Sequence, residues 1–264
     1  MEDHAPERLS TPALRRAARS AADWVDLQLT HVVRTLALLA PRASGRLLDV
    51  GCGDKPYEAL FTPFVSEYLG VEHRASFEAT AASLRGKADV IYEGDRLPFA
   101  DASFETVLSV QVLEHTPRPA ALVAEMARVL RPGGVLILSA PFSFRLHEEP
   151  HDYFRFSPHG LGELCGRAGL IIREIHPHGG LWSLVGHKLN TFLALRVARI
   201  GRVAQAMGKL EHEGVARERP RLWALPLVGP LMLAVSASAR GLDRALPEPT
   251  ETLGYTLLAS HAPR

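Results

Sequence analysis

Two carboxylates and a glycine turn lie close together early in this chain. Asp49 ends a short apolar run, and Gly51-Cys52-Gly53 follows. Such a run predicts a buried parallel strand, and small residues after it let the backbone turn sharply and approach a ligand. A second apolar run, residues 68–71, ends in Glu72. An acidic residue about 20 residues after a glycine turn is typical of a βαβ site that holds two ribose hydroxyls.

The turn lacks the third glycine of a dinucleotide fingerprint, because Pro56 stands at that position. A pyrophosphate ligand is therefore disfavoured, and a ligand with a ribose but no phosphates fits better. A third apolar run, residues 88–92, leads to Asp95, whose carboxylate could accept a hydrogen bond from an exocyclic adenine amine.

Groups able to move protons follow two later apolar runs. His115 comes soon after residues 106–110, and the loop after residues 135–139 contains His147, His151, Asp152 and Tyr153. Polar and aromatic residues crowded at the carboxyl edge of a sheet are expected to line a site. The alternative is a solvated loop that its aromatic residues hold in place.

The elements that must position these groups alternate between strand and helix. The sequence predicts strands at 47–50, 68–71, 88–92, 106–110, 135–139 and 170–175, and helices at 12–40, 57–64, 74–85, 119–130 and 158–169. This order favours a doubly wound α/β sheet, which places ligands at the carboxyl ends of its strands.

Several motifs occur in the order and spacing of the class I S-adenosylmethionine-dependent methyltransferases, and the chain resembles that family over about residues 45 to 175. They are Asp49-Val50-Gly51-Cys52-Gly53, Glu72, Gly94-Asp95, Leu97-Pro98-Phe99, Val112-Leu113-Glu114-His115 and Leu130-Arg131-Pro132-Gly133-Gly134. Within the family the chain is similar to the subgroup of quinone-biosynthesis and small-molecule enzymes. The resemblance implies a Rossmann-like seven-stranded sheet with an antiparallel last strand.

The resemblance also implies S-adenosylmethionine as cofactor and methyl transfer to a small-molecule, lipid or glycan acceptor. The residues it assigns to the cofactor are Asp49, Gly51, Cys52, Gly53, Glu72, Asp95, Arg96, Leu97 and Gln111. The candidate catalytic residues are His115, His147, His151, Asp152 and Tyr153, which matter if the acceptor must lose a proton. A non-catalytic binding or scaffold protein at a membrane surface is the alternative.

A metal site is a weaker hypothesis. Gln111-x-x-Glu114-His115 resembles the Glu-x-x-Glu-His pattern with which some relatives, including small-RNA 2′-O-methyltransferases, bind a divalent cation. Here a neutral amide replaces the first carboxylate, which should weaken a Mg²⁺ site. No metal ligand is therefore predicted.

The last strand is expected unusually late. The best candidate is residues 254–259. We therefore predict three parts: a methyltransferase core of residues 1–180, an apolar and basic helical insertion at 181–250, and a returning strand at 251–264. Residues 222–239 carry no charge over 18 residues, which reaches transmembrane length. A single crossing of the membrane would place strand seven on the opposite side from strand six, where the two could not pair. Pro226 and Pro230 are also expected to break a straight helix.

The insertion is also basic, since residues 181–264 contain 11 Lys and Arg against 6 Asp and Glu. Peripheral membrane contact through residues 181–240 fits this pattern. A helical cap on the core or a contact in a homodimer is the alternative.

Composition limits the remaining possibilities. The chain has 264 residues, 47% of them hydrophobic, which is ordinary for a globular protein with a full core. A net charge of +1 argues against a general nucleic-acid-binding surface. Cys52 and Cys165 form no metal-type pair, and the first twenty residues contain no apolar run of a signal peptide. These features predict a cytoplasmic protein, with the inner face of a membrane as its place of attachment.

Overall fold

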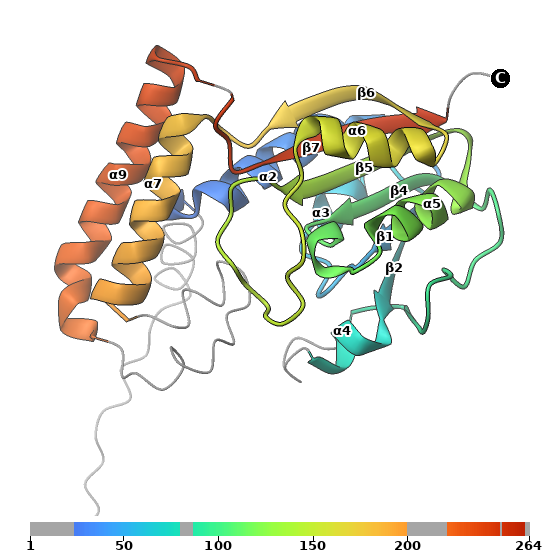
Figure 1. Cartoon of the computed structure of the whole chain (residues 1–264), viewed down its shortest axis with the longest axis horizontal. Helices are drawn as coiled ribbons and strands as arrows, with labels where there is room; N and C mark the ends of the chain where they lie inside the picture. The colour runs from blue at the N-terminus through green and yellow to red at the C-terminus, as the bar shows by residue number, and fades with distance from the viewer. Residues whose placement is uncertain (1–23, 80–86, 200–220, 249, 262–264) are drawn as a thin grey trace, which may run out of the picture.

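A computed structural model describes residues 24–79, 87–199, 221–248 and 250–261. A seven-stranded sheet of order β3-β2-β1-β4-β5-β7-β6 organises them (Figure 1). The strands are β1 Arg46–Val50, β2 Glu67–His73, β3 Val90–Tyr92, β4 Phe104–Val110, β5 Leu130–Pro141, β6 Leu170–Pro177 and β7 Gly254–His261. Strands β1 to β5 pair in parallel, whereas β7 pairs antiparallel with both β5 and β6. The predicted doubly wound sheet with an antiparallel last strand is confirmed.

Helices connect and cover these strands. They are α2 Leu27–Leu39, α3 Glu58–Phe61, α4 Arg74–Ala79, α5 Pro119–Val129, α6 Pro158–Arg167, α7 Leu181–Phe192 and α9 Leu225–Ala245. Side-chain caps start two of them, because Asp26 accepts a hydrogen bond from Leu29 N at 3.0 Å and Ser157 accepts one from Gly160 N at 3.1 Å. Residues 12–23 and 80–85 of the predicted helices lie outside the described residues.

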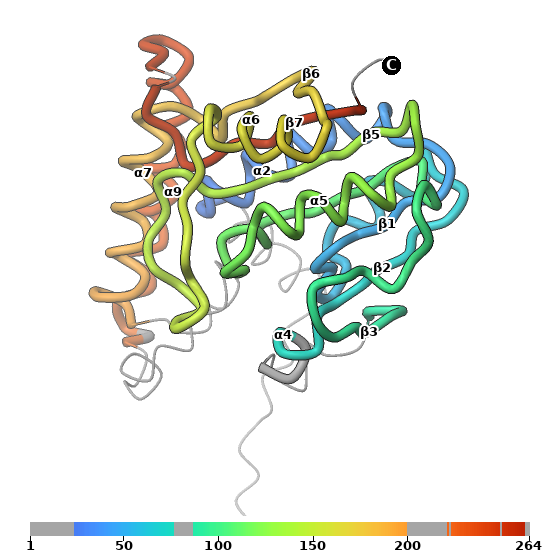
Figure 2. The backbone as a smooth tube through the Cα atoms, turned by 45° about the vertical axis from the view of Figure 1, so that its right-hand side comes forward, coloured from blue at the N-terminus to red at the C-terminus, as the bar shows by residue number. Residues whose placement is uncertain are grey.

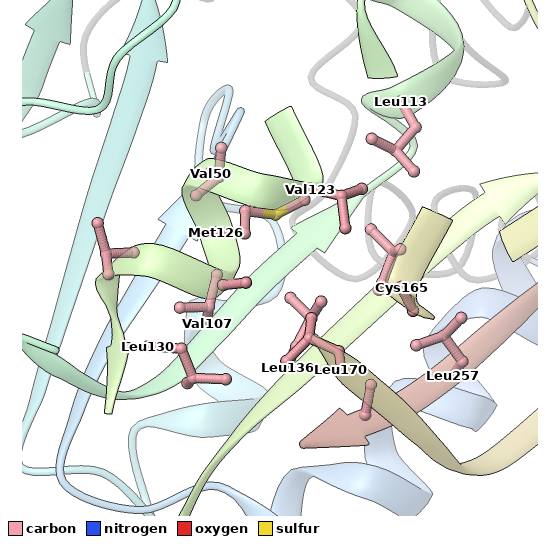
Figure 3. Packing of buried hydrophobic residues seen from close by; sticks show 14 of the residues in the cluster. Val50, Val107, Leu113, Val123, Met126, Leu130, Leu136, Cys165, Leu170 and Leu257 are labelled. Atoms are coloured by element: carbon pink, nitrogen blue, oxygen red, sulfur yellow. The ribbon is translucent and has the colours of Figure 1, made fainter. Parts of the chain in front are cut away.

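The core has two halves, one on each face of the sheet. Along β5, Leu136 and Leu138 join one buried cluster while Ile137 joins the other. Strand β7 alternates in the same way, with Leu257 on the first side and Leu258 on the second. This period of two is expected of a strand buried on both faces. Figure 3 shows the first half, where Leu136 and Leu257 pack with residues of α5 and α6.

The predicted insertion between strands six and seven is a helical hairpin at one end of the sheet, where α7 and α9 lie side by side (Figures 1 and 2). The two helices approach closely at Gly186, where a β-carbon would lie 2.8 Å from Cβ of Ala239. Asn190 Nδ2 also donates a hydrogen bond to Ser236 Oγ at 2.8 Å across the pair. The small residues and this buried hydrogen bond join α7 and α9 into one packed unit.

The prediction that two prolines would break α9 is wrong. Pro226 lies in the first turn, where no backbone N–H needs a partner inside the helix. Pro230 lies inside the helix and removes one intrahelical hydrogen bond. Val228, Met232 and Ala239, which are buried, keep the helix continuous because the rest of the hairpin covers this face.

Candidate cofactor and acceptor site

The glycine turn after β1 is held against β2. Gly51 has φ +75° and Gly53 has φ +53°, a left-handed region that favours glycine. The N–H groups of Gly51 and Cys52 donate to the carbonyl of Val71 at 2.9 and 3.3 Å. A β-carbon on Gly51 would lie 2.5 Å from Cγ2 of Val112, so the first glycine is required by both conformation and space.

Glu72 places its carboxylate on this turn. Its Oε2 accepts a hydrogen bond from Gly53 N at 3.1 Å, and its Oε1 accepts one from His73 N at 3.1 Å. Apart from its chain neighbours, no described residue has an atom within 4 Å of the point where a β-carbon on Gly53 would stand, so among the described residues the turn faces open space beside the carboxylate. The structure therefore brings the two motifs together at the carboxyl edge of β1 and β2.

Asp49 is almost completely buried beneath the turn, with 2% of its surface exposed. Burial raises the pKa of its carboxyl group to about 7, although a hydrogen bond from Tyr68 partly opposes this shift and the nearby Glu72 adds to it. The Tyr68 hydroxyl donates to Asp49 Oδ2 at 2.6 Å. The sequence alone assigned no role to this tyrosine. The signal that could have found it is its position in β2, the strand that contains Glu72 and pairs with β1.

His115 and His147 meet on the acceptor side, their ring centroids 4.7 Å apart. His115 Nδ1 lies 2.7 Å from the carbonyl oxygen of His151. Because a carbonyl can only accept, Nδ1 donates its proton to this bond, and Nε2 lies 3.8 Å from a carboxylate oxygen of Glu114 and of Glu148. Burial lowers the pKa of His147 to about 4, and the neighbouring His115 lowers it further. His147 is therefore neutral at pH 7, whereas His115 is the better placed proton acceptor.

Asp152 is buried in the loop after β5 and bonded on both of its oxygens. Its side chain is 1% exposed and forms two hydrogen bonds with the Arg155 guanidinium, at 2.5 and 2.7 Å, and one with His147 N at 2.9 Å. Burial alone would raise the pKa of Asp152, but these hydrogen bonds outweigh it and lower the pKa to about 2. The carboxylate thus anchors the loop after β5 and keeps His147 in place.

His151 and Tyr153 lie at the exposed rim of the same loop. His151 Nδ1 is 3.0 Å from the Tyr153 hydroxyl, and Tyr153 N donates to the carbonyl of Glu114 at 2.8 Å. The second contact ties the loop after β5 to the turn after β4. Both rim side chains can therefore reach an acceptor that enters from solvent.

Residues 48–138 match a family model described as a methyltransferase domain. This segment is similar to that domain. The matched residues contain the glycine turn, Glu72 and His115, so the family match and the site geometry cover the same part of the chain.

Relatives of the chain carry the same description. An uncharacterized methyltransferase from Mycolicibacterium paratuberculosis is 49% identical over 102 residues, which cover 37% of this chain and 40% of the relative. One from Mycobacterium leprae is 40% identical over 146 residues, covering 53% and 51%. The chain thus spans about half the length, or less, of these curated relatives.

A solved complex of the Haloferax volcanii Trm112 methyltransferase activator with a methyltransferase matches with a TM-score of 0.50 at 18% identity. The match covers 96% of this chain and 94% of the other. Likeness at this level of identity shows a shared fold.

The other four predicted cofactor residues lie farther along the chain, and they differ in placement. Asp95 and Arg96 are exposed, and Asp95 forms an ion pair with Arg118. Leu97 is 1% exposed in the core, and its N–H donates to Glu125 Oε2 at 2.9 Å, so neither its side chain nor its amide faces the glycine turn.

Gln111, the fourth, joins the site to α2. It has φ +56° at the end of β4, and its amide nitrogen donates to Ser139 Oγ at 3.0 Å. Its amide oxygen accepts from Gln28 Nε2 at 2.9 Å. The contribution of Gln28 was missed, because only the fold brings α2 beside the turn after β4.

Among the described residues, Glu114, His115 and His147 form a group whose ligand-type atoms all lie within 4.8 Å of one another. The Glu114 carboxylate is fully buried with no hydrogen-bond partner, and burial raises its pKa to about 8. One carboxylate and two imidazoles suit a transition metal better than Mg²⁺. The amide of Gln111 is bonded elsewhere, so it adds no fourth ligand to this group.

Proposed function

We propose that the protein transfers the methyl group of S-adenosylmethionine to a small-molecule, lipid or glycan acceptor. The observation that carries this proposal is the Glu72 carboxylate hydrogen-bonded to the glycine turn beside open space. A carboxylate there can accept hydrogen bonds from both hydroxyls of a ribose, while the turn leaves no cradle for a pyrophosphate. The methyltransferase relatives support the same reading.

In the proposed reaction the acceptor atom attacks the methyl carbon in line with the departing sulfur, which keeps the electron pair of the broken bond and leaves as a thioether. Holding the acceptor in line supplies much of the rate. If the acceptor must lose a proton, His115 Nε2 is the group that takes it. The hydrogen bond of His115 Nδ1 with the His151 carbonyl orients the ring for this role.

Calorimetric titration with S-adenosylmethionine tests this proposal, followed by mass spectrometry of candidate acceptors incubated with the complex. Saturable one-site binding and an acceptor gain of one methyl group are expected. Binding without transfer to any acceptor class would favour the scaffold alternative, and absence of binding would overturn both.

The affinity for S-adenosylmethionine should rise with pH up to about pH 7. Asp49 has a pKa raised to about 7, so below that pH the carboxyl is mostly protonated, and a cationic ligand favours its ionised form. Affinity should therefore fall up to about tenfold for each pH unit below 7, and binding at pH 6 should release about one proton. Calorimetry in buffers of different ionisation enthalpy measures both the affinity and the number of protons released. Asp49→Asn should remove the dependence of the affinity on pH. If the affinity of the parent for S-adenosylmethionine does not change with pH, the predicted role of Asp49 is wrong.

We also propose that the hairpin attaches the protein to a membrane surface. Trp223, Leu227 and Leu231 recur every four residues and are 74%, 74% and 50% exposed. Helix α9 is long and apolar enough to cross a membrane by length and composition, and 22% of its most apolar stretch is buried. Strands β6 and β7 pair in one sheet, so the chain leaves and returns on the same side. A hairpin lying in the interface fits these features better than a crossing.

Flotation with vesicles containing anionic lipid tests the attachment. The intact chain should float at low salt, helped by about 1 kcal/mol for each basic residue near the surface. Trp223→Ser with Leu227→Ser should reduce the floating fraction at least tenfold, because each exposed apolar side chain contributes about 1.5–3 kcal/mol when buried. Leu38→Ser, at a 59% exposed leucine of α2, is the control. An intact chain that stays in the soluble fraction would contradict the attachment.

A further inference from the structure

A cavity of about 220 Å³ lies between the loop after β5 and helix α7, two segments that run beside each other in Figure 2. It is lined by Ser143, Arg145, His187, Lys188, Thr191, Phe192, Leu195 and Arg196. The first two residues come from the loop and the other six from α7 and the π-helical turn Leu193–Val197 that continues it. None of them belongs to the residues that hold the cofactor turn.

The sequence of α7 explains how this wall forms. His187, Thr191 and Leu195 are spaced four residues apart, and the row Lys188, Phe192 and Arg196 runs beside them. Residues at intervals of four lie on one face of a helix. One face therefore presents cations at both ends and apolar side chains between them.

The charge of the lining is positive. Arg145, Lys188 and Arg196 contribute cations, and none of the lining residues is acidic. Lys188 and Arg196 are exposed and form no ion pair with another described residue. The Asp26 carboxylate lies 3.8 Å from His187 Nδ1, and Asp26 is buried and caps α2. The cavity therefore favours an anion.

The lining is also partly apolar. Phe192 is 56% exposed, and Leu195 lies next to it on the same face. A cavity of this size is smaller than the ~300–1,000 Å³ typical of whole ligand sites. It fits one acidic group and the first carbons of a chain, whose remainder would extend over Phe192.

A series of ring contacts connects this cavity to the candidate proton acceptor. The ring of His187 lies 5.3 Å from that of Phe144, and Phe144 lies 5.0 Å from His147, centroid to centroid. His147 in turn lies 4.7 Å from His115. The cavity and the acceptor side of the methyltransferase domain are therefore parts of one continuous wall.

We propose that this cavity binds the acidic group of the methyl acceptor, and that the acceptor is an anionic amphiphile, a phosphate or carboxylate on an apolar lipid-like chain. The proposal rests on the proposed methyl transfer and names the class of its acceptor. Lys188 and Arg196 hold the anionic group, Phe192 and Leu195 contact the chain, and the ring series leads toward His115.

The test uses dodecyl phosphate below its micellar concentration as the probe, titrated into the full chain with S-adenosylmethionine present. Inorganic phosphate and the uncharged octaethylene glycol dodecyl ether are the comparison ligands. Dodecyl phosphate should bind at least tenfold more tightly than either. Equal binding of the uncharged ether would overturn the anionic assignment, and equal binding of inorganic phosphate would overturn the amphiphilic one.

Lys188→Glu should weaken dodecyl phosphate binding at least tenfold. The matched control is Lys87→Glu, a reversal at another exposed lysine that lies near β3 on the opposite edge of the sheet and forms no ion pair with described residues. It should change the affinity less than twofold. Phe192→Ala should reduce the preference for dodecyl phosphate over inorganic phosphate. Unchanged binding in Lys188→Glu would overturn the proposal.

Titration of the same samples with S-adenosylmethionine separates this proposal from the function on which it rests. Both lysine variants should bind the cofactor like the parent, which also shows that they are folded. Normal cofactor binding without dodecyl phosphate binding would overturn the acceptor class alone. Absence of cofactor binding in the parent would overturn the proposed methyl transfer.

Discussion

Replacing Glu72 by alanine is expected to weaken the binding of S-adenosylmethionine by about 1–3 kcal/mol, the cost of losing a hydrogen bond to a charged group. This corresponds to an increase in the dissociation constant of about five- to 150-fold. The carboxylate lies on the glycine turn through its bond with Gly53 N, so its loss removes the ribose acceptor and loosens the turn. Isothermal titration calorimetry of the parent and the variant measures the difference.

The same strand offers a matched control. Glu67 begins β2, pairs with Arg46 and lies at the opposite end of the strand from Glu72. Its carboxylate is exposed to solvent, so Glu67→Ala should leave the cofactor affinity within about twofold, because exposed ion pairs contribute little. If Glu72→Ala titrates like the parent, the assignment of Glu72 to the ribose is wrong.

Replacing Arg155 by alanine is expected to lower the free energy of unfolding by about 3–5 kcal/mol, because Asp152 would be left as a buried charge without its partner. Arg155 also donates hydrogen bonds to the carbonyls of Phe144 and Arg145 at 3.1 and 2.7 Å. One guanidinium thus joins three parts of the loop after β5. Arg155→Lys should restore only part of the loss, since an ammonium group lacks the planar fork.

Urea unfolding of the parent and the variants gives these differences. The matched control is Arg167→Ala, which breaks a similar pair with Glu163 on α6 whose side chains are 71% and 66% exposed. That change should cost less than about 1 kcal/mol. A loss in Arg155→Ala no greater than in the control would show that the Asp152 carboxylate is solvated and does not anchor the loop.

Local signals were enough to predict that Glu72 and the glycine turn meet at one edge of the sheet. The apolar run before Asp49, the glycine turn and Glu72 lie in one β-strand–turn–strand unit, and the structure joins them through the bond from Gly53 to Glu72. Such a unit is specified by neighbouring residues, because the turn needs left-handed backbone and the strands need buried side chains. The late position of β7 was also predictable, since residues 254–259 were the apolar run left to complete the sheet.

The acceptor side was predicted as a set of residues but not as an arrangement. The sequence singled out His147 and Asp152 as equal candidates, whereas in the fold Asp152 is an ion-paired anchor and the ring of His147 meets that of His115 edge to face. Whether a carboxylate is a base or an anchor depends on burial and on its partner. Neither can be determined from residue type alone.

The sequence pattern gave a wrong prediction where tertiary packing outweighs the local preference of a residue. Pro230 was expected to interrupt α9, yet the contacts of the hairpin outweigh one lost backbone hydrogen bond. Leu97 belongs to a family motif, and the fold places it in the core with its amide bonded to Glu125. Propensity is a weak prior when a side chain is buried against another element.

The sequence by itself determined the doubly wound sheet, its antiparallel last strand and the carboxyl edge where Glu72 meets the glycine turn, because each depends on the order of short apolar runs and on residues within one βαβ unit. Only the tertiary structure decided the acceptor wall. It required α7, the loop after β5 and the turn after β4 to pack together, and those contacts between distant segments set burial, ion pairing and the cavity at Lys188.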